Sequence, residues 1–176
     1  MNDTNPTRTS TRRLLPDTLA SGARFSRCGR YRYTLWRQWN PARGTCLFIM
    51  LNPSTADAGG DDPTVAKCGR YARRWGFGRL EVRNIFALRS TDPAGLRRVY
   101  DPVGPGNDAA IARAARQADL VICAWGAHGS YLDRGQRVLA LIAGLGVDAY
   151  CLEKNADGAP RHPLYVTDSR QPMRLG

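Results

Sequence analysis

The chain has 176 residues, of which 43% are hydrophobic, and this favours one globular domain around a single core. No apolar run approaches the roughly 18 residues that a membrane-spanning helix needs, and the arginine-rich start lacks the hydrophobic stretch of a secretory signal. We therefore expect a soluble, cytoplasmic protein without a membrane partner. Five cysteines without a C-x-x-C pair, beside only two histidines, argue against a disulfide scaffold, a zinc site or an iron–sulfur cluster. We expect no metal and no cofactor.

The formal net charge is +11, and every basic residue except Lys67 and Lys154 is an arginine. Residues 1–44 contain nine arginines and only two acids, Asp3 and Asp17. Such a balance favours a polyanionic partner such as DNA, because guanidinium groups match phosphate oxygens and counterion release drives association. The alternative is an arginine-rich genome and an ordinary solvated surface.

Residues 1–20 are polar and are expected to form a flexible basic arm, with one domain over residues 21–176. Residues 30–39 alternate between apolar residues and Arg or Thr, which predicts a half-exposed strand. The turn sequence 40–44 precedes an apolar run at 45–51, which predicts a buried strand. We expect these two strands to pair as an antiparallel hairpin at the sheet edge.

A helix is predicted to begin at Asp61-Asp62-Pro63-Thr64, where an acidic cap precedes a proline in the first turn. Val65, Cys68, Ala72 and Trp75 follow at helical spacing and form its core face. Strands and helices then alternate: strands at 80–88, 119–125 and 148–152, and helices at 108–117 and 135–144. The pattern predicts an α/β protein with three layers and a central, mostly parallel sheet of about four strands plus the N-terminal edge hairpin.

Polar residues follow the first buried strand, at the place where open α/β sheets bind ligands. The Asn52 amide is expected at the rim of a site, with Pro53 stiffening the turn and the backbone amides of Ser54 and Thr55 free to bind an anion or water. Three carboxylates come next: Asp57, Asp61 and Asp62. They could bind a metal, activate water or cap the following helix.

Three later segments place polar residues at the ends of apolar runs. Asn84 lies inside an apolar strand before Phe86, where its amide either ties down backbone or recognises a base edge. Trp125-Gly126 ends another strand, and His128 follows it as a residue more typical of structure than of catalysis. His162 precedes a proline and follows Arg161, which favours a neutral imidazole able to donate a hydrogen bond to a developing anion.

Taken in order, these segments resemble the motifs of the uracil-DNA glycosylase superfamily. The corresponding segments are Leu51-Asn52-Pro53-Ser54, Asn84, Trp125-Gly126 and His162-Pro163-Leu164. The N-P-S-T-A-D and D-D-P-T segments also resemble an uncharacterised bacterial domain family in or near that superfamily. The chain departs from the usual pattern at Leu51, where the superfamily has glycine, and at Leu164-Tyr165, the second half of the last motif.

The resemblance implies a parallel sheet between helices, no cofactor, and hydrolysis of the N-glycosidic bond of a modified or deaminated base in DNA. We expect the protein to be a monomer. By this resemblance Asn52 holds the attacking water, as in the mismatch-specific branch, and Asn84 reads the extruded base. His162 stabilises the departing base, and Leu164 or Tyr165 fills the vacated stack. Asp57 and Asp62 are further catalytic candidates because an amide cannot take a proton. Without a carboxylate, turnover should be slow.

The remaining candidates complete the expected site. Pro53, Ser54, Thr55, Phe86, Trp125 and Gly126 are expected to bind substrate, and Lys67, Arg70, Arg74 and Arg161 the DNA backbone. Mismatched or single-stranded DNA should be favoured, because extruding a base from it costs least. Two other functions fit the same residues: a non-catalytic binder of nucleic acid or nucleotide, and an N-glycosidase acting on free nucleosides or nucleotides.

Overall fold

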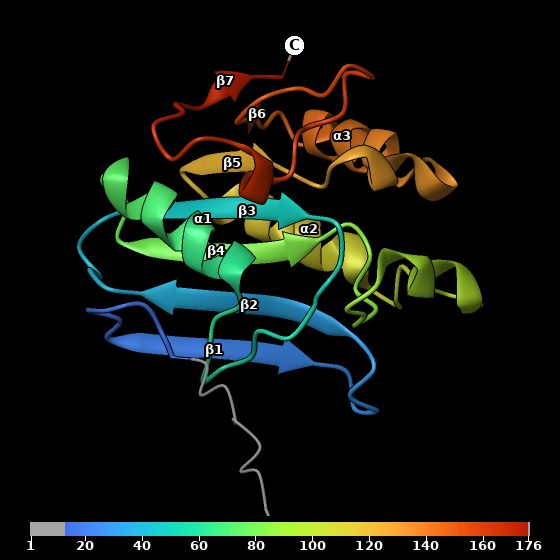
Figure 1. Ribbon diagram of the computed structural model, residues 1–176, viewed down its shortest axis with the longest axis horizontal. Helices are drawn as coiled ribbons and strands as arrows, with labels where there is room; N and C mark the ends of the chain where they lie inside the picture. Colours follow the sequence, from blue (N-terminus) through green and yellow to red (C-terminus); the bar gives the residue numbers. More distant parts are fainter. Residues whose placement is uncertain (1–12, 176) are drawn as a thin grey trace, which may run out of the picture.

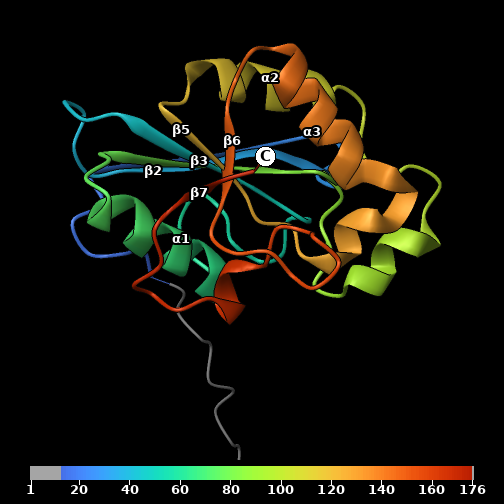
Figure 2. The same ribbon diagram turned by 90° about the horizontal axis from the view of Figure 1, so that it is seen from above.

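The computed structural model describes residues 13–175, which form a seven-stranded sheet with helices on both of its faces (Figures 1 and 2). The strands lie in the order β1-β2-β4-β3-β5-β6-β7. They are β1 (Ala20–Phe25), β2 (Arg32–Gln38), β3 (Thr45–Met50), β4 (Arg79–Asn84), β5 (Leu120–Cys123), β6 (Ala149–Cys151) and β7 (Met173–Arg174). The helices are α1 (Pro63–Arg74), α2 (Asn107–Gln117) and α3 (Arg134–Gly144), with 3-10 turns η1 (Pro93–Arg98), η2 (Ala127–Asp133) and η3 (Pro163–Tyr165).

The central strands β4, β3, β5 and β6 are parallel, whereas β1, β2 and β7 join the sheet antiparallel. Figure 2 shows α1 on one face of the sheet and α2 and α3 on the other. Strand β3 is covered on both sides: Phe48 and Met50 belong to one hydrophobic cluster, and Leu47 and Ile49 to a second. Its uninterrupted apolar sequence is the pattern expected of a central parallel strand. The predicted α/β class with a parallel central sheet is confirmed.

The predicted pairing of the first two strands is wrong. Strand β2 does not pair with β3, because β4 lies between them. The turn after β2 crosses the end of β4 instead, where the Gly44 carbonyl accepts from Gly78 N at 2.9 Å. Strand β2 forms its antiparallel hairpin with β1, a strand that the sequence analysis did not predict.

The arm predicted over residues 1–20 falls partly outside the described residues, which begin at Arg13. From there the chain lies against the domain. The Leu15 amide donates to Asp61 Oδ2 at 3.0 Å, and the Leu15 side chain packs against Gly69 of α1. Because Ala20 already belongs to β1, the expected domain boundary moves toward the N-terminus.

Helix α1 begins as predicted. Asp62 is its N-cap, with Oδ1 accepting from Val65 N at 2.9 Å, and Pro63 occupies the first turn. Val65, Cys68 and Ala72 are buried on its core face.

None of the helices in residues 13–175 is long and apolar enough to cross a membrane.

Candidate functional site

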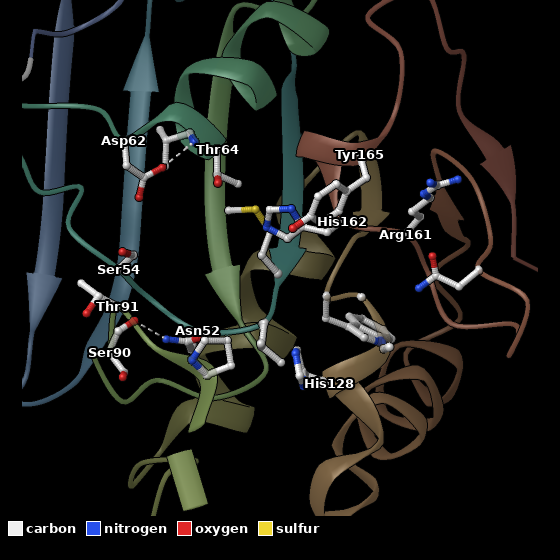
Figure 3. Close-up of a pocket in the computed structure, with 18 of the residues that line it drawn as sticks. Asn52, Ser54, Asp62, Thr64, Ser90, Thr91, His128, Arg161, His162 and Tyr165 are labelled. Carbon is white, nitrogen blue, oxygen red and sulfur yellow. Dashed lines mark hydrogen bonds between the residues drawn. The ribbon is translucent and has the colours of Figure 1, made fainter. Parts of the chain in front are cut away.

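A cavity of about 780 Å³ opens at the carboxyl ends of β3 and β5, and we refer to it as the main cavity (Figure 3). Its walls are contributed by segments far apart in sequence: the loop after β3, the start of α1, and the segments after β4, β5 and β6. Its lining includes Arg32, Met50, Leu51, Asn52, Ser54, Asp62, Val65, Ser90, Thr91, Trp125, Gly126, His128, Asp157, Arg161, His162 and Tyr165. The cavity therefore combines apolar walls with a few polar groups, as ligand sites do.

Asn52 is held in one orientation by its own amide group. Its Nδ2 donates to the Ser90 carbonyl at 2.7 Å (Figure 3) and to the Pro53 carbonyl at 3.1 Å. Since Nδ2 has two hydrogens and both are engaged, Oδ1 is the group left to meet a ligand. An amide oxygen at this position can accept a hydrogen bond from a water molecule.

Only one of the three candidate carboxylates lines the main cavity. Asp61 is paired with the buried Arg37, with Nε to Oδ1 at 2.8 Å. Asp57 is exposed, lies outside the main cavity, and its Oδ1 accepts from the Gly59 amide at 2.9 Å. Asp62 is 9% exposed and lines the cavity while its Oδ1 caps α1. Capping and a role in the site are thus compatible at Asp62.

His162 is the N-cap of η3, and Figure 3 shows its ring among the residues of the main cavity. Its Nδ1 accepts from Leu164 N at 3.4 Å, and its ring lies 5.8 Å from that of Tyr165. Burial lowers the pKa of His162 below its ordinary value of 6.5, so the imidazole is neutral at pH 7. With Nδ1 as acceptor, the proton is on Nε2, which is a hydrogen-bond donor.

Trp125 and Gly126 lie beside His162 at the end of β5. Gly126 has φ 74° and ψ −172°, a conformation essentially restricted to glycine, and a Cβ there would lie 3.6 Å from His162 Cβ. Trp125 is only 3% exposed, and its ring packs over Gly129 and Gly135, leaving no room for a Cβ at either. Trp125 is therefore mainly a core residue that contributes one wall of the cavity.

Asn84 does not line the main cavity, which corrects the expectation that it contacts a base directly. It is 2% exposed at the end of β4, and its Oδ1 accepts from Arg32 Nη2 at 3.3 Å. Arg32 lines the cavity, and Asn84 contacts Arg32 from outside the lining. Phe86 is likewise in the core, with its ring 5.7 Å from that of Tyr131, and Pro53 is buried outside the lining.

Arg32 is the site residue that the sequence analysis missed. The alternation of residues 30–39 placed Arg32 and Arg37 on the exposed side of a strand, yet they are 2% and 0% exposed. The loop after β3 covers them: the Ala56 carbonyl accepts from Arg32 Nη1 at 2.7 Å, and the Asp57 carbonyl from Arg37 Nη2 at 2.5 Å. The alternating pattern separates the two faces of the strand, but it does not tell whether the face that carries the arginines is exposed or covered by another segment. The sequence therefore contained only a weak signal for the burial of Arg32.

A second hollow of about 690 Å³ adjoins the main cavity and shares Ser54, Ser90 and Thr91 with it. We call it the basic groove; it is completed by Gly29, Arg30, Thr55, Asp57, Leu88 and Arg89. The Arg89 guanidinium is held over the Phe25 ring at 4.9 Å and donates to the Gly29 carbonyl at 3.1 Å. Thr55 lines this groove rather than the main cavity.

Three of the residues expected to contact the DNA backbone lie outside both the main cavity and the basic groove. Lys67, Arg70 and Arg74 surround the C-terminal Asp168: Lys67 Nζ is 3.2 Å from Asp168 Oδ1, and Arg74 Nη1 donates to the Asp168 carbonyl at 2.7 Å. Arg161 lines the main cavity and pairs with Glu153 at 2.6 Å.

Leu164 and Tyr165, the two residues expected to fill the space that an extruded base leaves in the DNA stack, differ in position. Leu164 is 44% exposed and does not line the cavity, whereas Tyr165 is 71% exposed and lies at its rim. Tyr165 is therefore the better placed of the two to contact a ligand entering the cavity. Across residues 13–175 no group of three or more His, Cys, Asp or Glu side chains is arranged to hold a metal ion.

The fold and the cavity define a mixed α/β protein with a candidate ligand site, a cavity at the carboxyl ends of parallel strands. The chain belongs to the family described as Protein of unknown function (DUF1643), whose model matches residues 32–164. The matched span includes Arg32, Asn52, Asp62 and His162. No significant match was found among curated proteins or among solved structures.

Proposed function

We propose that the protein is a DNA N-glycosylase that releases a modified or deaminated base from DNA, with an α/β/α arrangement like that of the uracil-DNA glycosylase superfamily. One observation carries the proposal: Asn52 and Asp62, from the segment between β3 and α1, and the distant His162 line one cavity beside a basic groove. The ordered motifs support it, because three of the four contribute to the lining of that cavity.

Breaking an N-glycosidic bond places positive charge on the sugar and negative charge on the departing base. In the proposed reaction the neutral His162 donates from Nε2 to the base as its negative charge develops. The apolar wall, including Leu51, Val65 and Trp125, excludes water and strengthens this hydrogen bond. Such a positioned donor typically contributes a factor of about 10²–10³ in rate.

The attacking water is assigned to Asn52 Oδ1, the group of that amide that accepts no hydrogen bond from residues 13–175. Because an amide cannot accept a proton, the proton of that water goes to Asp62, the carboxylate of the three candidates that lines the cavity. Asp62 also places a negative charge near the sugar, where the oxocarbenium charge develops.

The basic groove is the proposed site of the DNA backbone. It continues from the main cavity past Ser54 and Ser90, so a nucleotide with its base in the cavity would place a phosphate near Arg30 and Arg89. This replaces the earlier assignment of the backbone to Lys67, Arg70 and Arg74, whose charges contact Asp168.

The test is base release from oligonucleotides carrying uracil, hypoxanthine, xanthine or hydroxymethyluracil, in single strands and in mismatched duplexes. We expect slow release by the full chain and a loss of about 10²-fold or more in N52A, D62N and H162A. D148N is the matched control, because Asp148 is an exposed carboxylate outside both hollows. Equal activity in all four variants would reject the assignment of these residues.

The two alternative functions are outcomes of the same experiment. Tight oligonucleotide binding without release of any base would favour a non-catalytic binder. Release confined to free nucleosides would favour a small-molecule N-glycosidase, which the arginines of the basic groove argue against.

A further inference from the structure

Four arginines are buried in the part of the chain that the structure describes, and three of them contact a carboxylate. The ion pairs are Arg37–Asp61 at 2.8 Å, Arg83–Glu81 at 2.5 Å and Arg134–Asp108 at 2.6 Å. Arg32 is the fourth: it is 2% exposed and forms no ion pair with a described carboxylate. It is also the one of the four that lines the main cavity.

The hydrogen bonding of Arg32 is incomplete. Its Nη1 donates to the Ala56 carbonyl at 2.7 Å and its Nη2 to Asn84 Oδ1 at 3.3 Å, while its buried Nε has no partner among residues 13–175. A guanidinium has five N–H donors, so these two acceptors leave most of its capacity unused. Burial lowers the pKa of Arg32 to about 10, which still leaves the side chain positively charged at pH 7.

The negative charges of Asp62 and Asp57 act on Arg32 through space and partly offset the effect of burial on its pKa, but neither carboxylate forms an ion pair with it. A buried guanidinium whose N–H groups are not all hydrogen-bonded is still costly. A ligand in the main cavity can supply a further partner if it presents a hydrogen-bond acceptor, because a guanidinium only donates. Asn84 takes part as a positioning residue, because its Oδ1 accepts from Nη2 and so holds that end of the guanidinium beside the cavity.

Deamination of a nucleobase replaces an amino group by a carbonyl. Cytosine becomes uracil and adenine becomes hypoxanthine, and in each case a hydrogen-bond donor turns into an acceptor. We propose that Arg32 is the specificity-determining residue of the site, and that it selects a base with a carbonyl at the deaminated position over the parent base, which has an amino group there. The inference rests on the proposed function, since it assumes that the ligand is a nucleobase.

The direct test is binding of free bases to the full-length protein, measured by NMR titration or calorimetry. Uracil should bind more tightly than cytosine, and hypoxanthine more tightly than adenine, by about 10- to 100-fold, the range expected for a hydrogen bond to a charged group. In R32M both ratios should fall toward one. Should R32M fail to fold, N84A keeps the charge but frees Nη2, and the same ratios should fall.

R134M is the matched control. It removes another buried arginine, one that holds the Ile85 carbonyl and Asp108 outside both hollows. A purely structural arginine should lower the melting temperature without changing the ratio of uracil to cytosine affinity. Arg32 differs from it only if R32M changes that ratio.

The outcomes separate this inference from the proposed function. Base release with a preference for uracil that survives in folded R32M and N84A would overturn the role of Arg32 and leave the glycosylase proposal intact. Selective binding of uracil that is lost in R32M, without release of any base, would support the role of Arg32 and overturn the glycosylase proposal. Tighter binding of cytosine or adenine would mean that the Asp62 carboxylate recognises an amino group, and would overturn the assignment to Arg32.

Discussion

Asp62 is expected to stabilise the start of α1 and to assist the reaction, and two substitutions separate the roles. D62A removes the hydrogen bond from Val65 N, which is 2.9 Å long and buried, together with the negative charge at the helix start. Loss of a cap costs about 1 kcal/mol, and loss of the charge about 0.5 kcal/mol. D62N keeps an oxygen that can cap the helix and removes only the charge.

Urea unfolding followed by tryptophan fluorescence provides the measurement, because the chain contains four tryptophans. We expect D62A to lower the free energy of unfolding by about 1.5 kcal/mol, and D62N by about 0.5 kcal/mol. In a domain of this size 1 kcal/mol corresponds to about 2–4 °C in melting temperature. Base release should be lost in both variants.

Two results would refute this reasoning. If D62N lost as much stability as D62A, the charge of Asp62 rather than its hydrogen bond would support the helix, through Arg32 or the helix dipole. If D62N kept full base release, the carboxylate would have no part in the chemistry and Asn52 would have to act alone.

Three further predictions concern the surroundings of the site. G126A should lower the free energy of unfolding by about 1–3 kcal/mol, because alanine is strained at φ 74° and ψ −172°; an unchanged urea midpoint would contradict this. Because burial lowers the pKa of His162 in the folded state, the unfolded chain binds more protons below pH 6.5, so stability should fall as the pH falls below that value. H162Q should flatten this dependence, and an identical pH profile in the variant would refute it. R30Q and R89Q should each reduce the slope of log binding constant against log salt for an oligonucleotide by about 0.7–0.9, with R116Q, an exposed arginine of α2, unchanged.

Two kinds of element were predictable from sequence: strands covered on both faces, and helices that begin with a capping residue and a proline. The run 45–51 became β3 because an uninterrupted apolar strand belongs in the centre of a parallel sheet. Helix α1 began where Asp62 and Pro63 predicted, because a cap and a first-turn proline are local features. Strand β7, two residues long, was too short to leave a pattern.

Strand neighbours were not predictable in the same way. The turn after β2 suggested a hairpin with β3, but residues 79–84 pair with both strands and separate them. Pairing depends on which strands can bury their faces together, and partners distant in sequence compete with adjacent ones.

The sequence by itself determined the class of fold and most of the helices and strands, and it singled out Asn52 after a buried strand and His162 before a proline. Only the tertiary structure decided which of two chemically equivalent residues, adjacent in sequence, reaches the cavity. Asp61 and Asp62 are adjacent carboxylates, yet Arg37 pairs with the first and the second lines the main cavity. Arg32 likewise became buried because a loop from elsewhere in the chain covers its side of β2. The direction of a side chain follows from local backbone geometry, whereas its surroundings are contributed by segments whose packing no local pattern specifies.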